Sequence, residues 1–289
     1  MKTDPLLLRN VRPWGAAATD VLIENGRITT IAPNQSSTVA VEDGGGAILL
    51  PGLIEAHTHL DKSLWGMGWQ EHQAGPSLRD KINTERRLRK EWDIEPHRQS
   101  MRQALLSLGH GSTAIRSHVD IDTETGLSGL EGVLQTAKTL SGQITIQTVA
   151  FPQSGLMSRP GTLDLMQEAM QMGADVVGGL DPCGIDADPK GQLDAVFALA
   201  EKHGKPIDIH LHEPGDLGAF SMEMILERTQ AHGMQGRVTI SHAFCLGMPD
   251  RDRARALVAR LAEARIHIAT VATPSRPVPL AEDLRAAGV

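Results

Sequence analysis

Seven short apolar runs alternate with longer amphipathic stretches over most of the 289 residues, and this alternation constrains the fold more than any other feature. Strand-sized runs that alternate with helical patterns are typical of parallel βα units. The predicted strands are 53–59, 113–121, 143–151, 174–182, 206–213, 237–244 and 266–273. The predicted helices are 95–110, 128–141, 161–173, 191–204, 219–233, 251–264 and 280–289. Together they predict an α/β fold of the TIM-like (β/α)₈-barrel type.

The segment before these units has a different pattern. Asn25-Gly26 separates two β-rich runs within residues 20–33, which is the strongest short-range signal for a β-hairpin. A glycine cluster then leads into the first apolar run of the barrel pattern. We therefore expect residues 1–50 to be the N-terminal part of a small β-sandwich domain, and residues 51–289 to be the barrel domain.

The barrel pattern is one unit short. A closed barrel of this type needs eight strands, whereas residues 280–289 look like the helix after the seventh strand. Because open sheet edges are a liability in solution, we expect that the chain stops before strand eight and is a fragment, or that a partner segment closes it. The long connection 60–81 is expected to be a lid or mouth loop, and the basic run 86–90 a solvated helix face.

Composition and charge restrict the partners. A formal net charge of −7 disfavours nucleic acid, because phosphate binding draws on clustered Lys and Arg. No apolar run reaches the roughly 18 residues of a membrane span. The two cysteines, Cys183 and Cys245, lie far apart, which suits a reducing compartment, and we expect a cytoplasmic protein. The sequence is silent on oligomeric state and leaves a homo-oligomer open.

Polar side chains gather at the predicted C-terminal ends of the strands, where functional residues of parallel barrels collect. These residues are His57, His59, His118, Asp120, Gln153, Asp181, His210, His212, Glu213 and His242. Side chains two apart in a strand share a face, so His57 and His59 can point at one spot. Imidazole nitrogens suit Zn²⁺ and Fe²⁺, and a third imidazole from another strand would leave positions open for water and substrate. His210 is the best candidate for that third position.

A His-X-His pair by itself is weak evidence, because most such pairs in unrelated proteins bind nothing. The pair gains weight only through the histidines that end the predicted fifth and sixth strands, His210 and His242. The combination favours a metal site over a purely structural interpretation.

Several stretches carry a family resemblance, in the same order and over nearly the whole chain. They are 51-PGLIEAHTHLDK-62, 115-IRSHVDI-121, 149-VAFPQSGL-156, 173-GADVVGG-179, 207-IDIHLHE-213 and 239-TISHAF-244. They resemble the cytosine deaminase-like branch of the amidohydrolase superfamily, which also includes isopropylammelide isopropylaminohydrolases. The resemblance implies a metal-dependent hydrolase that deaminates a cytosine-like or triazine-like ring with metal-activated water.

The resemblance also implies roles for individual residues. His57, His59 and His210 resemble the three imidazole ligands of one divalent ion, Zn or Fe, with Mn also compatible. Glu213 resembles the acid/base that moves a proton to the ring nitrogen. His242 resembles the histidine that hydrogen-bonds the water or the substrate.

Contacts to a small heterocyclic substrate are expected from four further residues: Gln153, which resembles the glutamine that reads the polar edge of the ring, and His118, Asp181 and Trp69. The predicted fourth strand has no lysine to bridge two metals, which favours a single ion. His212 stands where cytosine deaminases commonly have an acidic residue, which loosens the substrate assignment.

Two alternatives stay open. A related amidohydrolase could cleave the C–N bond of a cyclic amide or a substituted amine. The family's strand-eight aspartate, a metal ligand that takes the proton from water, has no counterpart between Ile266 and Val289. A truncated, inactive product that lacks this residue is therefore the second alternative.

Overall fold

A computed structural model describes residues 4–36, 38–71, 73–273 and 276–289. The chain divides into two compact units, Met1–Leu53 and Ile54–Val289. None of the helices in these described ranges has the length and apolar character needed to cross a bilayer.

The N-terminal unit is a five-stranded sheet. Its strands are β1 (Leu6–Pro13), β2 (Thr19–Glu24), β3 (Arg27–Ala32), β4 (Ala40–Asp43) and β5 (Ile48–Leu49). Their order is β3-β2-β1-β4, and β5 also pairs with β1. The predicted hairpin is confirmed: β2 and β3 pair antiparallel around Asn25 and Gly26, whose φ angles of 53° and 72° suit a tight two-residue turn.

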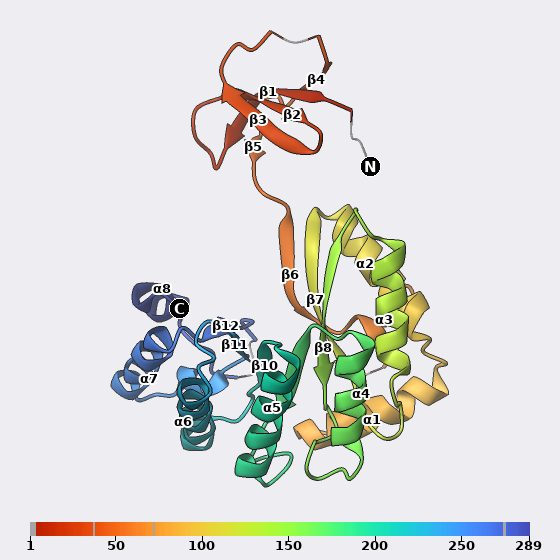
Figure 1. The fold of residues 1–289 in the computed structure, drawn as a ribbon, viewed down its shortest axis with the longest axis vertical. Helices are drawn as coiled ribbons and strands as arrows, with labels where there is room; N and C mark the ends of the chain where they lie inside the picture. Colours follow the sequence, from red (N-terminus) through yellow and green to blue (C-terminus); the bar gives the residue numbers. More distant parts are fainter. Residues whose placement is uncertain (1–3, 37, 72, 274–275) are drawn as a thin grey trace. The chain divides into compact units, whose positions relative to one another are not determined.

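The second unit contains the barrel strands. They are β6 (Leu53–Thr58), β7 (Ser112–Asp120), β8 (Thr145–Phe151), β9 (Val176–Leu180), β10 (Ile207–His210), β11 (Val238–Ser241) and β12 (His267–Ala269). They lie side by side in chain order, and the pairs from β7 to β12 are parallel. Figure 1 shows these strands coloured along the sequence. In the described residues the sheet has seven strands, with β6 and β12 at its edges. The predicted α/β barrel architecture is confirmed.

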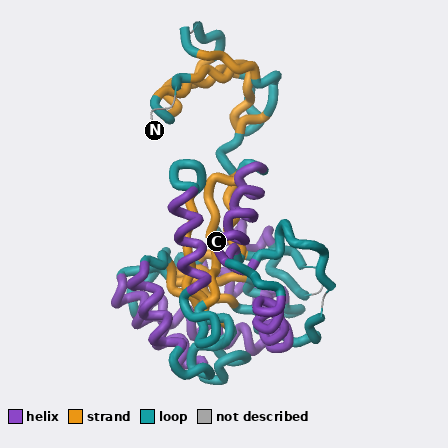
Figure 2. Tube along the Cα trace, turned by 90° about the vertical axis from the view of Figure 1, so that its right-hand side faces the viewer, coloured by secondary structure: helices purple, strands orange, loops and turns teal. Residues whose placement is uncertain are grey.

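Helices surround this sheet, as Figure 2 shows in purple around the orange strands. They are α1 (Leu78–Glu91), α2 (Pro96–Gly109), α3 (Ser128–Thr139), α4 (Thr162–Met172), α5 (Pro189–His203), α6 (Gly215–Ala231), α7 (Arg251–Glu263) and α8 (Ala281–Ala287). Two short 3₁₀ helices, η1 (Leu60–Lys62) and η2 (Phe244–Gly247), follow β6 and β11. Strand residues such as Val177 and Ile209 pack with helix residues such as Phe197 in one hydrophobic core. Burial of this apolar surface is the main stabilising contribution.

The connection between β6 and β7 differs from its prediction. It is irregular in the described residues between Lys62 and Leu78, but η1 and the start of α1 lie within the range 60–81. Helix α1 carries the basic run 86–90. The prediction of a solvated face is wrong for Arg89, which is 9% exposed and pairs with Asp61 and Asp120. Those partners lie far away in sequence, so the local pattern could not reveal the burial.

Candidate active site

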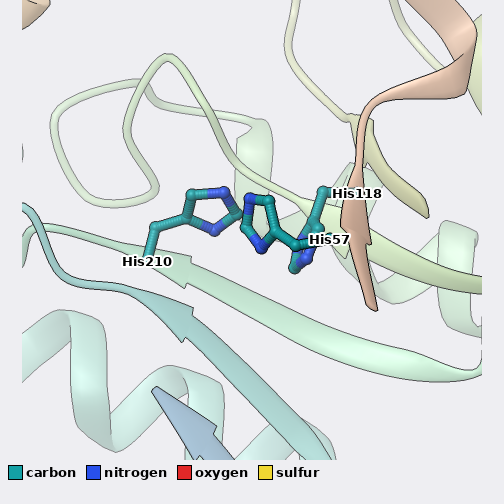
Figure 3. Close-up of side chains that lie close together, drawn as sticks. All are labelled: His57, His118 and His210. Carbon is teal, nitrogen blue, oxygen red and sulfur yellow. The ribbon is translucent and has the colours of Figure 1, made fainter. Parts of the chain in front are cut away.

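Three imidazoles from three strands converge at the carboxyl ends of the sheet. His57 lies on β6, His118 on β7 and His210 on β10. Each ring offers one nitrogen, and these nitrogens all lie within 4.8 Å of one another. Figure 3 shows the rings grouped at one spot. This spacing is compatible with one ion held between them.

Two further histidines adjoin this group. The His59 ring centroid lies 5.6 Å from that of His57 and 5.5 Å from that of His210. The His242 ring, just after β11, lies 4.7 Å from His57 and 5.0 Å from His210. We expected His118 to contact substrate, but its ring lies 4.2 Å from His57 and 4.5 Å from His210. The structure therefore places His118 among the candidate ligands.

Six ring nitrogens of this cluster are buried without hydrogen-bond partners among the described residues. In the described residues, both ring nitrogens of His118 and His210 lack hydrogen bonds, as do Nδ1 of His59 and Nδ1 of His242. Buried polar atoms without partners cost free energy, and each one in a native structure needs an explanation. A divalent cation fits this donor set, because neutral imidazole is a good ligand for Zn²⁺ and Fe²⁺.

Burial keeps these rings neutral. It lowers the pKa of His57 and of His118 to about 3, and the pKa of His242 to about 2. It also lowers the pKa values of His59 and His210 well below 6.5. A neutral imidazole keeps a lone pair free for a metal ion.

A chain of hydrogen-bonded side chains outside the imidazole group orients the His57 ring. Nδ1 of His57 lies 3.1 Å from the hydroxyl of Ser241, which donates to Oδ1 of Asp208 at 2.7 Å. Arg116 pairs with the other Asp208 oxygen at 2.8 Å. Outer partners of this kind fix the ring and leave Nε2 to face a metal. Sequence reasoning missed all three partners, because buried serine and aspartate carry no distinctive spacing.

Glu213 is held in a defined orientation beside this cluster. Its Oε1 accepts from the backbone N–H groups of Cys183 and Gly184 at 2.9 and 2.7 Å, and its Oε2 accepts from the Ser221 hydroxyl at 2.5 Å. Burial raises the pKa of Glu213, although the hydrogen bond from Ser221 opposes the rise. A carboxyl group with a raised pKa suits proton transfer near neutral pH.

His212 and Asp181 form a pair next to Glu213. Nδ1 of His212 lies 2.8 Å from Oδ2 of Asp181. The His212 ring stacks on His242 at 4.3 Å and 25°. Asp181 is buried, and both of its carboxylate oxygens accept hydrogen bonds from the loop that contains His212.

A cavity of about 620 Å³ opens beside these groups. His212, Glu213, Phe244 and Arg276 line it, together with residues of the 76–79 segment and Asp181. Arg276 lies over the Phe244 ring, 5.4 Å from its centroid. The volume of this cavity is in the range of sites that bind small molecules.

Gln153 and Trp69 differ in their placement. Gln153 is buried, its Oε1 accepts from Lys62 at 2.5 Å, and its Nε2 donates to Glu85 at 2.7 Å. Lys62 and Glu85, both unforeseen, therefore set the orientation of this amide. Trp69 is 86% exposed, and it is not among the described residues that line the cavity beside Glu213.

Lys62 belongs to a buried ionic cluster with Arg89. Its Nζ lies 3.1 Å from Asp120, and Arg89 bridges Asp120 and Asp61 at 3.0 and 2.5 Å. Burial opposes the charge on Lys62, but Asp120 and Glu85 outweigh it and raise the pKa of the amine. The cluster ties η1, α1 and β7 together next to the site.

With the barrel and its imidazole cluster established, comparison with known proteins places the chain in a family. A model of the amidohydrolase family matches residues 97–288. This chain belongs to the amidohydrolase family, which confirms the resemblance drawn from the sequence motifs.

The most informative relatives are enzymes that act on nitrogen heterocycles. The chain is 33% identical to the N-isopropylammelide isopropyl amidohydrolase of Pseudomonas sp. (strain ADP), over 78% of this chain and 57% of that protein. The structure of N-isopropylammelide isopropylaminohydrolase from Burkholderia multivorans is 48% identical, with a TM-score of 0.94 over 99% of this chain and 73% of that one. The structure of 5-methylcytosine deaminase from Klebsiella pneumoniae is 27% identical, with a TM-score of 0.82 over 98% and 73%.

The chain spans about half the length of the curated relatives that it matches, 55% and 57% for two of them.

Proposed function

We propose that the protein hydrolyses an exocyclic C–N bond on a cytosine-like or triazine-like ring and releases ammonia. The observation that carries this proposal is the position of Glu213. Its oriented carboxyl group lines a ligand-sized cavity together with His212, which stacks on His242 of the imidazole cluster. The likeness to an isopropylaminohydrolase and to a 5-methylcytosine deaminase supports this reaction class.

The proposed site holds one divalent ion. His57 and His210 would supply two ligands; for the third, the sequence pattern designates His59, whereas the separation of the nitrogens designates His118. When bound, such an ion supplies a Lewis acid that makes water nucleophilic at neutral pH. Metal analysis of His59→Asn and His118→Asn tests the third ligand, because the ligand variant loses most of the bound metal and the other retains it.

The protein's own residues would handle protons and substrate. The protonated carboxyl of Glu213 donates to the ring nitrogen as water adds to the ring carbon. The resulting carboxylate takes the proton that the added water loses and delivers it to the departing amine. His242 hydrogen-bonds the attacking water or the substrate. Gln153, held by Lys62 and Glu85, binds the polar edge of the ring. The products are the hydroxylated ring, or its oxo tautomer, and the amine.

A second candidate is the removal of an alkylamine in place of ammonia. It is favoured by the greater identity to the isopropylaminohydrolase structure, 48%, than to the cytosine deaminase structure, 27%. A panel of pyrimidines, pterins and amino- or alkylamino-triazines, assayed for ammonia and for alkylamine, separates the two candidates.

Glu213→Gln tests the proton shuttle. The substitution keeps the shape of the side chain and removes the acid, so kcat is expected to fall by about 10²–10⁴ with metal content unchanged. Glu223→Gln, on α6 and half exposed, is the matched control. Near-normal turnover in Glu213→Gln would contradict the assigned role.

A further inference from the structure

We propose that Asp181 and His212 form a specificity element, in which Nε2 of His212 accepts a hydrogen bond from an N–H group of the substrate ring. The site would thereby select lactam-type rings, in which a ring N–H lies beside a carbonyl. Asp181 acts as a positioning residue and His212 as the group that touches substrate. This inference rests on the proposed function and names the class of ring that the same site accepts.

The first step is the proton on Nδ1. Oδ2 of Asp181 lies 2.8 Å from Nδ1 of His212, and Oδ1 accepts the backbone N–H groups of His212 and Glu213 at 2.6 and 3.2 Å. An ionised carboxylate has only acceptors, so Nδ1 of His212 must be the donor. In a neutral imidazole the other nitrogen, Nε2, then carries a lone pair.

The second step is the fixed position of the ring. The Asp181 side chain is 4% exposed, and the His212 ring stacks on His242. His210 and Phe244 pack at centroid distances of 5.7 and 6.0 Å. A ring held on these sides has little freedom to turn, so Nε2 keeps one direction.

The third step is access. The His212 side chain is 16% exposed and lines the same cavity as Glu213. Within the described parts of the chain, its Nε2 has no hydrogen-bond partner. A lone pair at the wall of a ligand-sized cavity, next to the acid/base candidate, is placed to accept an N–H group of a ring bound there. A ring that presents only a lone pair at this edge would be repelled and left without a partner.

Asp181→Asn tests the specificity element, because the amide has the same shape as the carboxylate but reverses the direction of the hydrogen bond to Nδ1 of His212. The amide oxygen must remain where the two backbone N–H groups need an acceptor. The amide nitrogen therefore takes the place of Oδ2 and donates to Nδ1, which moves the His212 proton to Nε2. The ¹⁵N shifts of histidine-labelled protein at about pH 8, where an ordinary imidazole is neutral, report the tautomer directly. We expect Nδ1–H in the wild type and Nε2–H in Asp181→Asn.

Ligand binding supplies the second readout. Uracil and its two N-methyl derivatives are the probes, since methylation removes one ring N–H at a time. The methyl group meets the same cavity in the wild type and in Asp181→Asn. Comparing the ratio of the uracil affinity to the N-methyluracil affinity between the two proteins therefore cancels the steric cost of the methyl group. The preference for uracil over one N-methyl derivative is expected to be about tenfold larger in the wild type than in Asp181→Asn.

Two further variants complete the test. His212→Gln removes the ring and is expected to lose the N–H preference as well, which keeps the test valid if Asp181→Asn does not fold. Asp194→Asn, an exposed carboxylate on α5 away from the cavity, should behave as the wild type. An Nε2–H tautomer in the wild type, or an unchanged preference in both site variants, would overturn the inference. Neither readout needs turnover, so absence of amine release alongside an intact N–H preference would count against the proposed function alone.

Discussion

Ser241 connects His57 to a buried carboxylate: its hydroxyl lies 3.1 Å from Nδ1 of His57 and donates to Asp208 at 2.7 Å. Such outer partners orient metal-binding imidazoles, and their removal typically costs 10–100-fold in metal affinity. Ser241→Ala is therefore expected to lower Zn²⁺ affinity by about that factor, measured by competition with a chelator. Ser141→Ala, at an exposed position, should leave the affinity unchanged. Equal Zn²⁺ affinities in the two variants would show that Ser241 does not support metal binding.

The Ser221 hydroxyl stabilises the charged form of Glu213. In Ser221→Ala this charge-assisted hydrogen bond is lost, so the already raised pKa of Glu213 is expected to rise further. Any pH limit of kcat that depends on Glu213 should move to higher pH by the same amount. The control is Thr229→Val, which removes a buried hydroxyl from the same helix but leaves Glu213 untouched. A pH profile that does not move in Ser221→Ala would argue against Glu213 as the group that titrates.

Arg89 and Arg87 lie on the same helix and make opposite kinds of ion pair. Arg89 is buried between Asp61 and Asp120, whereas Arg87 pairs with Glu91 at the surface. Arg89→Met leaves buried Asp61 without its ion-pair partner and Asp120 with Lys62 alone, and it is expected to lower the free energy of unfolding by about 3–5 kcal/mol. Arg87→Met should cost about 0.5 kcal/mol or less. Urea unfolding of both variants checks this, and similar losses would show that the ionic cluster does not stabilise the fold.

The depressed histidine pKa values predict how metal binding depends on pH. With the pKa values of His57 and His118 at about 3, both rings stay neutral as the pH falls below 6.5. Zn²⁺ affinity of the metal-free protein should change by less than about threefold between about pH 7 and about pH 5.5. Three ordinary imidazoles would be mostly protonated at the lower pH, and the loss would exceed about a hundredfold. Titrations at both pH values distinguish these results.

The order and type of the barrel elements could be predicted from the sequence because they follow from local periodicity. The ends of the strands could be predicted less well from the sequence. Residues 206–213 were predicted as one strand, but β10 ends at His210, so His212 and Glu213 lie in the following loop. Alternating polar residues after a strand look like its continuation, and only the pairing with neighbouring strands determines the end.

The histidines could be found because imidazoles at strand ends are rare and chemically specific. The residues that orient them could not. Ser241 contacts His57, Ser221 contacts Glu213 and Lys62 contacts Gln153 through packing of elements far apart in the chain. Serine, lysine and aspartate are common in every surface segment, so their residue type alone gives no such signal.

The proposed reaction depends on the binding of a single divalent ion by the buried imidazoles. A crystal structure of the Zn²⁺-loaded protein, with anomalous diffraction recorded at the zinc edge, would locate that ion. We predict one strong anomalous peak at about 2.0–2.1 Å from a ring nitrogen of His57 and of His210, with a third imidazole completing the set. No peak within bonding distance of these rings, or zinc bound only elsewhere on the surface, would contradict the account.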